Sequence, residues 1–373
     1  MIHPARLINY HVLRARLEAA IADGNVSIKS SGDHQLFCYT QQAVYSRAWD
    51  DATTMARGLI VNWREERVVA TPFSKFWNLG ERDEPIPDLP FDCLEKLDGS
   101  LIVLWHDGER WRCCTKGSFD SDQARAAQHW IAERRLSALV PGTTYLAEWL
   151  APDNRIVVRY DRPELALLAA YDELGAELEY PIIRRIAHVL GWRVAERHSF
   201  DSLADLVAHA ETLPSTQEGF VLRFANGLRL KVKGQEYRRI HRLISNVTPL
   251  AIWEAMAAGD DMESMRRNLP EEFWIDYDTI AGLLSDAIQD ILAQVRGAVC
   301  AVADAGWTDK ELGLQLHRWH EPVRSLIFPL RKHGDLMQGK ARRSLFRAVR
   351  PTGNRLAGYT PSSAMNRAMD EAA

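Results

Sequence analysis

Lys96-Leu97-Asp98-Gly99-Ser100 is the stretch of this chain around which its other sequence signals are arranged. It places a lysine two residues before an Asp-Gly pair, just before the apolar, strand-like segment that begins at Leu101. Asp-Gly pairs favour tight turns. A short Lys-x-Asp-Gly match also fits an ordinary surface turn, so its meaning depends on the polar residues found at later positions.

Composition is that of a soluble globular protein. The chain has 373 residues, 46% hydrophobic and 26% charged, which is enough for two domains or for one large domain with an appendage. A formal net charge of −4 gives no overall attraction for nucleic acid, so a basic site has to be local. No apolar run approaches the ~18 residues of a membrane span, and residues 1–6 lack the apolar core of a signal peptide. The 5 cysteines lack metal-ligand spacing, which predicts reduced thiols and a cytoplasmic protein.

Apolar periodicity divides the chain into a strand-rich part and a helical part. Residues 1–24 have apolar positions at helical spacing, and the segment from about 26 to 240 is rich in strand patterns separated by Gly, Asp and Asn turns. Two hairpins and three helices are predicted within it, the hairpins on Asp107-Gly108 and Asn226-Gly227 and the helices near 121–138, 180–190 and 201–212. Strand patterns disappear after about residue 245, which predicts a boundary at 245–249 and a helical C-terminal domain.

Two lysines on one predicted strand supply the positive charge that a reactive lysine needs. A lysine amine attacks phosphorus only when neutral, and its pKa of about 10.4 in water keeps it protonated at neutral pH. Nearby cations and desolvation lower that pKa. Lys231 and Lys233 lie two residues apart, so their side chains share a strand face, and a short hairpin joins them to Glu218. An ordinary exposed strand face also fits such a pair.

Other charged residues interrupt apolar segments. Glu148 breaks the apolar run at 144–149, where a carboxylate is costly unless it has a partner or a metal. Arg57 and Lys75 are likewise set into apolar segments, in Ala-Arg-Gly-Leu-Ile and Pro-Phe-Ser-Lys-Phe-Trp-Asn. Each of these residues, taken alone, also fits a structural role.

In this order and at this spacing, the segments resemble one family. The chain is similar to the phage-type RNA ligase 1 family, ATP-dependent RNA ligases of the covalent nucleotidyltransferase superfamily, over residues of about 30 to 243. The resemblance implies an α+β fold, with a nucleotidyltransferase (ATP-grasp-like ligase) domain of antiparallel sheets flanked by helices at 1–243. It also implies an all-helical C-terminal domain, placed at 250–358 as an RNA-specificity module, and we expect a flexible tail at 359–373.

The resemblance also implies residue roles. Lys96 matches the lysine that becomes covalently adenylylated, and Lys231 and Lys233 match paired lysines that contact phosphate. Glu148 and Glu218 match carboxylates that assist a metal ion, directly or through water. The remaining ATP-binding positions match Tyr39, Arg57, Lys75 and Lys116, and Tyr237 also fits the family pattern.

Two positions depart from the family pattern. Trp77 follows Phe76 where a second phenylalanine is expected, which changes only the type of aromatic side chain. Ala147 precedes Glu148 where the family has a phenylalanine, which shortens a side chain beside the nucleotide pocket and bears on nucleoside packing.

The matches imply a reaction in three steps. Lys96 would attack the α-phosphorus of ATP and release pyrophosphate, AMP would pass to the 5′-phosphate of an RNA end, and a 3′-hydroxyl would then displace AMP. Charge builds on phosphoryl oxygens each time, so preorganised cations and Mg²⁺, with Mn²⁺ as an alternative, are the main catalytic resource. The expected partner is single-stranded or broken tRNA-like RNA, in RNA or tRNA repair. We expect a monomer in the cytosol of a bacterium or a phage-infected host, acting after a separate kinase/phosphatase has healed the ends.

A basic stretch stands in the predicted helical domain. Between Arg324 and Arg355 there are nine Lys or Arg residues against one acid, Asp335. This pattern fits an RNA-backbone surface or a solvated helix face with acidic neighbours. The expected RNA contacts are Lys340, Arg342, Arg343 and Arg347.

Three alternatives remain open from the sequence. A DNA ligase or an mRNA capping enzyme shares the Lys-x-Asp-Gly chemistry but usually carries a strand-rich OB-fold after the first domain, whereas the region after 245 is predicted to be helical. A catalytically inactive RNA-binding protein on the same fold would need the basic stretch but not Lys96. A template-dependent nick-sealing RNA ligase differs in substrate geometry, which the sequence does not expose.

Overall fold

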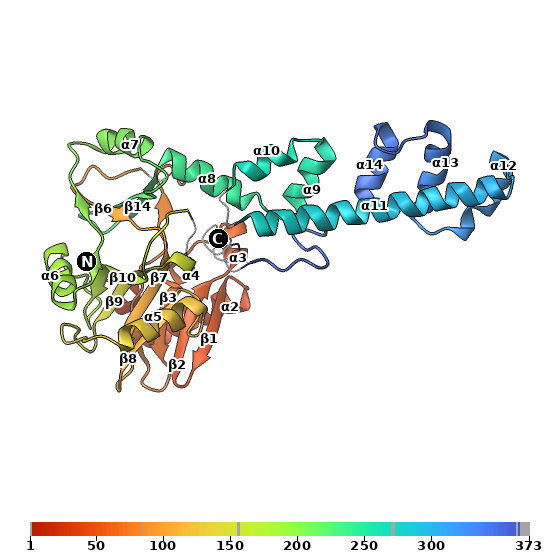
Figure 1. The fold of residues 1–373 in the computed structure, drawn as a ribbon. Coiled ribbons are helices and arrows are strands. Elements are labelled where there is room, and N and C mark those ends of the chain that lie inside the picture. Colours follow the sequence, from red (N-terminus) through yellow and green to blue (C-terminus); the bar gives the residue numbers. More distant parts are fainter. Residues whose placement is uncertain (1, 84, 155–156, 270–272, 363–364, 366–373) are drawn as a thin grey trace. The chain divides into compact units, whose positions relative to one another are not determined.

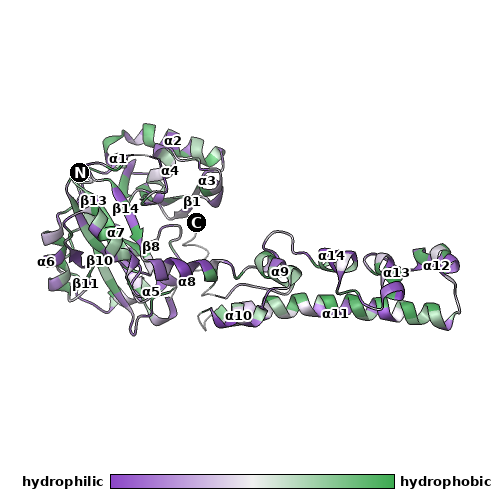
Figure 2. Ribbon diagram, turned by 90° about the horizontal axis from the view of Figure 1, so that it is seen from above, coloured by the Kyte–Doolittle hydropathy of each residue, from purple (hydrophilic) through white to green (hydrophobic). Residues whose placement is uncertain are grey.

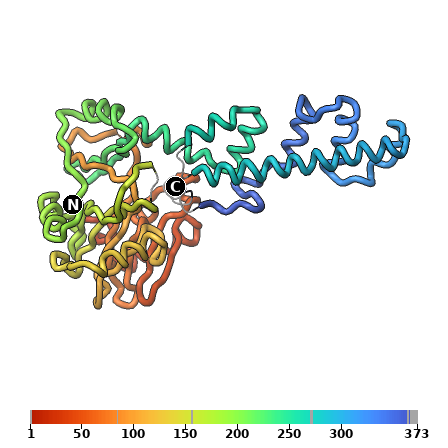
Figure 3. The backbone as a smooth tube through the Cα atoms, viewed as in Figure 1, coloured from red at the N-terminus to blue at the C-terminus, as the bar shows by residue number. Residues whose placement is uncertain are grey.

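A computed structural model describes residues 2–83, 85–154, 157–269, 273–362 and 365, and the chain forms two compact units, which can be followed in Figures 1 and 3. Unit 1 comprises residues up to Arg239, and unit 2 begins at Ile240. The division falls inside helix α8 (Gln235–Ser245), a few residues before the boundary predicted at 245–249. None of the described helices is both long and apolar enough to cross a membrane.

Sheet I of unit 1 is antiparallel, with the strand order β1-β2-β3-β4. Its strands are β1 (Val26–Ser31), β2 (His34–Tyr39), β3 (Arg57–Asn62) and β4 (Arg67–Ala70). Helices α1 (Pro4–Leu7), α2 (Tyr10–Ala22) and α4 (Asp51–Met55) contribute to the apolar cluster on one face, where Leu13 and Met55 pack with Phe37 and Leu59. A short helix, α3 (Gln41–Tyr45), joins β2 to α4.

The single helix predicted over 1–24 is divided into α1 and α2. Ile8 between them has extended backbone angles, and the Asn9 side chain caps α2 by accepting a hydrogen bond from His11 N. An asparagine at this position satisfies an amide that the first helical turn leaves unpaired. Apolar spacing alone does not reveal such an interruption.

Sheet II lies against the other face of sheet I and has the strand order β11-β10-β9-β7-β8. Its strands are β7 (Ser100–His106), β8 (Trp111–Thr115), β9 (Thr144–Leu150), β10 (Glu164–Tyr171) and β11 (Arg193–Val194). Ile60 and Val69 of sheet I pack with Val103 and Leu146 of sheet II. The opposite face of sheet II is covered by α5 (Asp122–Ala132) and α6 (Tyr180–Leu190). A 3₁₀ turn, η1 (Pro152–Asn154), follows β9.

Sheet III has the order β12-β6-β13-β14-β5 and carries Lys96. Its strands are β5 (Trp77–Asn78), β6 (Phe91–Lys96), β12 (Arg197–His198), β13 (Gly219–Phe224) and β14 (Arg229–Lys233). Helix α7 (Leu203–Glu211) packs on it through Leu206 and Ala210, which contact Phe220 and Leu222. Sheets II and III are antiparallel except for one short edge strand each, because β11 pairs with β10 and β5 pairs with β14 in parallel.

Both predicted hairpins form, β7–β8 and β13–β14. The turn of the first is longer than a two-residue Asp-Gly turn, because Asp107 Oδ1 accepts hydrogen bonds from Glu109 N and Arg110 N, each at 2.9 Å. Helices α6 and α7 lie where the sequence predicts them, whereas α5 ends at Ala132, before the predicted end at 138.

The described part of unit 2 is helical and has its own apolar core. Its helices are α9 (Pro249–Ala258), α10 (Met262–Arg267), α11 (Trp274–Asp304), α12 (Asp309–Gln315), the 3₁₀ turn η3 (Leu316–Arg318), α13 (Val323–His333) and α14 (Gly339–Ala348). Apolar and polar residues alternate along α11 in Figure 2, and its buried side chains, such as Val295, pack with Leu326 of α13 and Leu345 of α14. Trp253 of α9 donates a hydrogen bond to Phe346 O at 2.8 Å.

The tail expected at 359–373 lies mostly outside the described residues. Where it is described, Tyr359 Oη, Ser362 N and Ser362 Oγ donate hydrogen bonds to the buried carboxylate of Asp276, at 2.9, 2.8 and 2.6 Å.

Gly219 allows the close approach of β13 and β14. Its φ is +143°, and a Cβ built there would lie 2.1 Å from Val232 O and 2.8 Å from Lys233 Cα. In a regular strand, consecutive side chains point to opposite faces. The unusual φ at Gly219 breaks this alternation and brings the side chain of the preceding Glu218 to the face on which Gly219 lies.

Gly219→Ala is expected to lower the free energy of unfolding by at least ~2 kcal/mol, because the added methyl group meets backbone atoms and the φ is unfavourable for alanine. Urea denaturation measures the change. Gly32→Ala is the matched control, since Gly32 also has a positive φ, +58°, but its Cβ would have nothing within 4 Å. Equal losses in the two variants would contradict the role given to the close approach.

Candidate active site

Lys96 lies in a row of residues that runs across sheet III. The strand register pairs Lys96 of β6 with Gly219 of β13, and Gly219 with Lys233 of β14. Directly opposed residues on neighbouring strands share a face of the sheet. The side chains of Lys96 and Lys233 therefore flank a residue that has no side chain.

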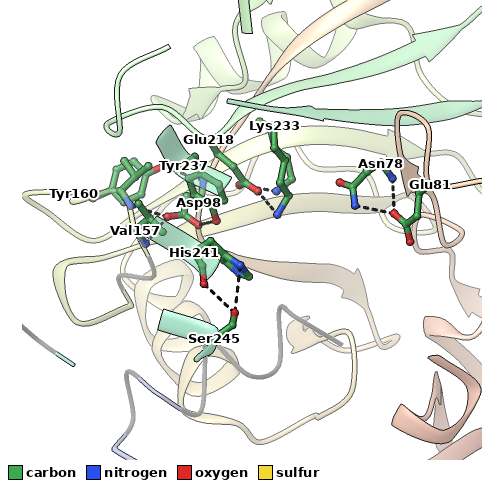
Figure 4. A network of polar contacts seen from close by, with 12 residues as sticks. Asn78, Glu81, Asp98, Val157, Tyr160, Glu218, Lys233, Tyr237, His241 and Ser245 are labelled. Atoms are coloured by element: carbon green, nitrogen blue, oxygen red, sulfur yellow. Dashed lines mark hydrogen bonds and ion pairs between the residues drawn. The ribbon is translucent and has the colours of Figure 1, made fainter. Parts of the chain in front are cut away.

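The carboxylate of Glu218 bridges these two lysines. Lys96 Nζ lies 2.6 Å from Glu218 Oε2, and Lys233 Nζ lies 3.0 Å from Glu218 Oε1, a pairing visible at Glu218 and Lys233 in Figure 4. The Glu218 side chain is fully buried. Burial alone would raise the pKa of the Glu218 carboxyl, but the charges and hydrogen bonds of both lysines outweigh burial and hold that pKa below its usual value. Glu218 is therefore an anion that fixes two ammonium groups.

Asp98, the aspartate of the Lys-x-Asp-Gly stretch, is completely buried and ties three segments together. Its Oδ2 accepts hydrogen bonds from Val157 N at 2.8 Å and Val158 N at 2.6 Å. Its Oδ1 accepts one from Tyr237 Oη at 2.8 Å, and Asp98 N donates to Tyr160 Oη at 3.1 Å (Figure 4). Asp98 thus anchors the turn after Lys96 to helix α8, which follows β14, and to the segment around Val157 and Val158.

Gly99 brings the same turn close to Glu148. A Cβ at Gly99 would lie 2.4 Å from Trp149 O and 3.0 Å from Glu148 Cγ, so a larger residue would push the turn away from β9. Glu148 lies in the middle of β9, opposite Leu101 of β7, and is 8% exposed. The sequence-predicted carboxylate of β9 therefore lies beside the glycine that follows Lys96 and Asp98.

A second group of cations surrounds Tyr39, at the end of β2. Lys75 Nζ lies 5.1 Å and Lys116 Nζ 5.7 Å from the centre of the Tyr39 ring. Burial tends to raise the pKa of the Tyr39 hydroxyl, but the charges of Lys116, Arg57 and Lys75 together bring that pKa below its usual value. Four of the predicted ATP-binding residues, from four separate loops and strands, therefore meet where the central strands β2 and β3 of sheet I end and begin.

Lys231 connects the two groups. Burial is the largest cause that lowers its pKa well below the usual value, followed by the charges of Arg57, Lys96, Lys233 and Lys75. Its ammonium lies 5.0 Å from the Phe76 ring, whose centre is also 5.4 Å from the Arg57 guanidinium carbon. Because the charges of both groups act on Lys231, the basic residues Arg57, Lys75, Lys96, Lys231 and Lys233 belong to one positively charged region.

The sequence did not identify several residues that shape this site. Asp98 was quoted only as part of its motif, although its buried contacts fix the turn. Trp49 was not singled out, yet its ring centre lies 5.0 Å from Lys75 Nζ. Tyr160 follows Arg159 in the sequence, and no motif marks it. The one clue in the sequence was the position of Asp98 in a turn motif. A carboxylate that becomes buried there needs several hydrogen-bond donors.

A metal ion would need ligands from outside the protein. Among the described residues, no group of three or more His, Cys, Asp or Glu side chains forms a metal site. Mg²⁺ commonly uses one or two carboxylates, substrate phosphates and waters. Glu148 and Glu218 fit that mode as the carboxylates, and the two lysines already bound to Glu218 favour Glu148 for direct contact and Glu218 for contact through water.

The predicted RNA contacts of α14 belong to unit 2 and do not all have the same surroundings. Lys340, Arg343 and Arg347 are exposed. Arg342 instead donates hydrogen bonds to Ala257 O and to Met256 O, the latter at 2.8 Å, and its guanidinium carbon lies 4.7 Å from the Phe346 ring. Arg342 therefore binds carbonyls at the end of α9 and helps to hold α14 there.

Known proteins resemble this chain over much of its length. A family model described as RNA ligase matches residues 55–237. A putative bifunctional polynucleotide kinase/RNA ligase of Autographa californica nuclear polyhedrosis virus is 26% identical over 247 residues, covering 58% of this chain and 35% of the relative. A putative RNA ligase of Thermovibrio ammonificans is 28% identical over 209 residues, covering 50% of this chain and 52% of the relative. An RNA ligase of Rhodothermus phage RM378 is 26% identical over 301 residues, covering 60% and 67%.

The match spans about a third of the first of these relatives and about half of the second. Among solved structures, an archaeal ATP-dependent RNA ligase aligns with a TM-score of 0.48 at 14% identity, covering 75% of this chain and 83% of that one. The matched segment, residues 55–237, contains the Lys96 row, Glu148 and Glu218. Through that segment, the chain belongs to the phage-type RNA ligase 1 family.

Proposed function

We propose that this protein is an ATP-dependent RNA ligase that joins a 5′-phosphate to a 3′-hydroxyl through lysyl-AMP and RNA-adenylate intermediates. The observation that carries the proposal is the placement of Lys96, 2.6 Å from the buried carboxylate of Glu218, in a site with many cations. Those cations are Arg57, Lys75, Lys116, Lys231 and Lys233. Family membership supports the same reaction.

In the first step, the Lys96 amine attacks the α-phosphorus of ATP, a nitrogen–phosphorus bond forms and pyrophosphate leaves. The amine has to lose a proton before it attacks, and the positive charges of the neighbouring cations favour that loss. Glu218 Oε2, 2.6 Å away, holds the Lys96 side chain in place. The phosphates would be bound, and the charge that develops on them stabilised, by Lys231, Lys233, Arg57 and Lys75. Tyr39 holds Lys75 and Lys116 by cation–π contact at the edge of the same site.

In the second step, the 5′-phosphate of the RNA attacks lysyl-AMP, and Lys96 leaves with a proton. In the third, a 3′-hydroxyl attacks the activated phosphate, and AMP leaves. A divalent ion, Mg²⁺ or Mn²⁺, would supply further charge stabilisation between Glu148, Glu218 and the substrate phosphates. Charge thus changes on phosphoryl oxygens throughout, while the cations stay fixed by Glu218 and the strands.

The RNA substrate that we propose is single-stranded or broken tRNA-like RNA, in RNA repair. We propose that a separate kinase or phosphatase first heals the ends, because the baculovirus relative is named as both a kinase and a ligase. Four of the cysteines, Cys38, Cys93, Cys113 and Cys114, are buried as free thiols and Cys300 is an exposed free thiol, which supports the cytoplasm as the compartment. We propose that the region 250–358 is the RNA-specificity module and that the protein acts as a monomer.

The alternatives have less support. A DNA ligase or a capping enzyme usually carries an OB-fold, whereas the described residues from 250 to 349 form helices and connecting turns. An inactive RNA-binding protein would not require a lysine fixed by a buried carboxylate between two strands. A nick-sealing RNA ligase remains a question of substrate, which assays with single strands and nicked duplexes separate.

Lys96→Ala is expected to abolish transfer of label from α-labelled ATP to the protein, because the nucleophile is removed. Gel autoradiography after incubation with Mg²⁺ or Mn²⁺ measures the transfer. Lys29→Ala, at an exposed position of β1, is the control and should label as the wild type does. Labelling of the Lys96→Ala protein would refute the assignment.

Lys231→Met and Lys233→Met are expected to change stability in opposite directions while both reduce adenylylation by about 10²–10³-fold. Lys231 is held among cations, so removing its charge should raise Tm at pH 7 by on the order of 2–4 °C. Lys233 neutralises Glu218, so its removal should lower Tm. Calorimetry at several pH values measures both effects.

The pH dependence has a defined sign. The pKa of Lys231 is lower in the folded protein than its usual 10.5, so the unfolded chain binds more protons between those two values. The folded wild type therefore gains stability as pH rises through that window, and Lys231→Met should lack this gain. A Tm difference that does not shrink toward pH 10.5 would argue against a strained ammonium at Lys231.

Charge reversal at Arg343 and Arg347 is expected to weaken RNA binding, because these exposed residues lie four apart on α14 and share a helix face. The slope of log K against log salt should fall by about 1.4, or ~0.7 for each lost contact with single-stranded RNA. Arg184→Glu with Arg185→Glu, at exposed positions of α6, controls for net charge. An unchanged salt slope would count against the proposal.

A further inference from the structure

Three aromatic side chains form what we call the aromatic ledge, Tyr39, Trp49 and Trp77. The ring centres of Tyr39 and Trp49 lie 5.2 Å apart, and those of Trp49 and Trp77 lie 6.0 Å apart, both in edge-to-face contact. Tyr39 ends β2, Trp49 precedes α4, and Trp77 begins β5. The ledge therefore starts at the cations that surround Tyr39 and continues along two tryptophans that the proposed chemistry does not use.

Trp49 and Trp77 differ from the core tryptophans of the same unit. Both are only half-buried, whereas Trp130, Trp149 and Trp192 are buried together in the cluster between sheet II and its helices. An aromatic side chain that serves only packing is normally removed from water as far as possible. The remaining exposure of the two ledge tryptophans leaves ring surface for a ligand.

The turn before α4 holds Trp49 in place. Trp49 N donates a hydrogen bond to Arg47 O at 2.8 Å, and Ala48 N donates one to Ala43 O at 3.0 Å. Arg47 has a φ of +52°, which is uncommon for a residue other than glycine. Asp50, directly after Trp49, caps α4 by accepting a hydrogen bond from Thr53 N at 2.8 Å. Hydrogen bonds on both sides of Trp49 therefore fix the turn that carries its side chain.

Cations lie over the rings of the ledge. Lys75 Nζ is 5.0 Å from the Trp49 ring centre, and the Arg82 guanidinium carbon is 4.3 Å from the Trp77 ring centre. Half-exposed aromatic rings interleaved with positive charge suit a ligand that has both flat bases and phosphates. Unpaired nucleotides have this combination, whereas the bases of a duplex are already stacked on each other and cannot reach the rings.

We propose that the aromatic ledge binds the unpaired bases of the RNA strand next to the phosphate that is joined. The inference rests on the proposed ligase function and adds to it the side chains that would contact the bases of its single-stranded substrate. Lys75 Nζ lies 5.1 Å from the centre of the Tyr39 ring and 5.0 Å from that of Trp49. Because Lys75 is also one of the cations proposed to bind phosphate, a strand whose phosphate lies at Lys75 would have its neighbouring bases beside Trp49 and Trp77. Tyr39 then separates the phosphate end of the site from the base-stacking end.

The test compares the affinity of the full chain for two labelled RNAs by fluorescence anisotropy. One is a short 5′-phosphorylated single strand, and the other is the same strand with abasic nucleotides next to the 5′-phosphate. Because base–aromatic stacking is worth roughly 5- to 100-fold per base, the wild type should prefer the intact strand by at least about 5-fold. A duplex of the same sequence should bind more weakly than the intact single strand.

Trp49→Leu and Trp77→Leu should each reduce this preference toward 1, whereas Trp49→Tyr, which keeps a ring, should retain most of it. Trp63→Leu is the matched control, because Trp63 is 43% exposed and also has an arginine, Arg64, at 5.3 Å from its ring centre. The Trp63→Leu protein should keep the full preference. Retention of the preference in both ledge variants, or its absence in the wild type, would overturn the proposal.

Label transfer from ATP to the wild-type protein separates this inference from the proposed function. If the wild type forms no lysyl-AMP, the ligase proposal fails, whatever the RNA measurements give. If the wild type is labelled but Trp49→Leu loses labelling and keeps the preference for intact RNA, the ledge serves only to place Lys75, and the stacking proposal is wrong.

Discussion

One buried carboxylate makes this site possible. Glu218, whose side chain is fully buried, neutralises Lys96 and Lys233 at once, at 2.6 and 3.0 Å. Without it, sheet III would place two ammonium groups on β6 and β14, on either side of Gly219 of β13, with no negative charge between them, and mutual repulsion would oppose the pairing of these three strands. The carboxylate reaches that place because Gly219 lets the backbone turn Glu218 onto the lysine face. The nucleophile, its partner lysine and the strand register therefore depend on the same two consecutive residues.

Glu218 does not neutralise all the basic side chains of the site. The positive charge that remains is what the proposed reaction needs to bind phosphates. No ion pair of Lys231 is found among the described residues, and its pKa is lowered by burial and by four neighbouring cations. In the proposed reaction, bound phosphates would relieve the repulsion among these side chains, so part of the binding free energy for ATP would come from that relief. The sheets hold these side chains close together despite their mutual repulsion. Asp98 fixes the turn after Lys96 through four hydrogen bonds, which limits how far the lysines can move apart.

Local patterns predicted the parts of the structure that local physics controls. The two hairpins, α6, α7 and the shared face of Lys231 and Lys233 follow from turn residues and from the two-residue period of strands. The position of Glu218 between the lysines does not follow from that period, because regular alternation would turn it away from the Gly219 row. The contacts of Asp98 could not be predicted either, since Tyr237 is 139 residues away along the chain. Asn9 divides the first helix through a side-chain cap, and Trp49 reaches Lys75 through a turn that periodicity does not describe.

Counting charges along the sequence also overstates the surface that a helix offers to RNA. Of the nine basic residues between Arg324 and Arg355, Arg324 is paired with Glu321, Arg331 with Asp309, and Arg342 binds carbonyls of α9. These three support unit 2 itself. Lys340, Arg343 and Arg347 are exposed and recur at intervals of three and four residues, so they form one face of α14. A net charge of −4 for the whole chain is compatible with phosphate binding because positive charge is concentrated in two places, paired around Glu218 in unit 1 and exposed along α14 in unit 2.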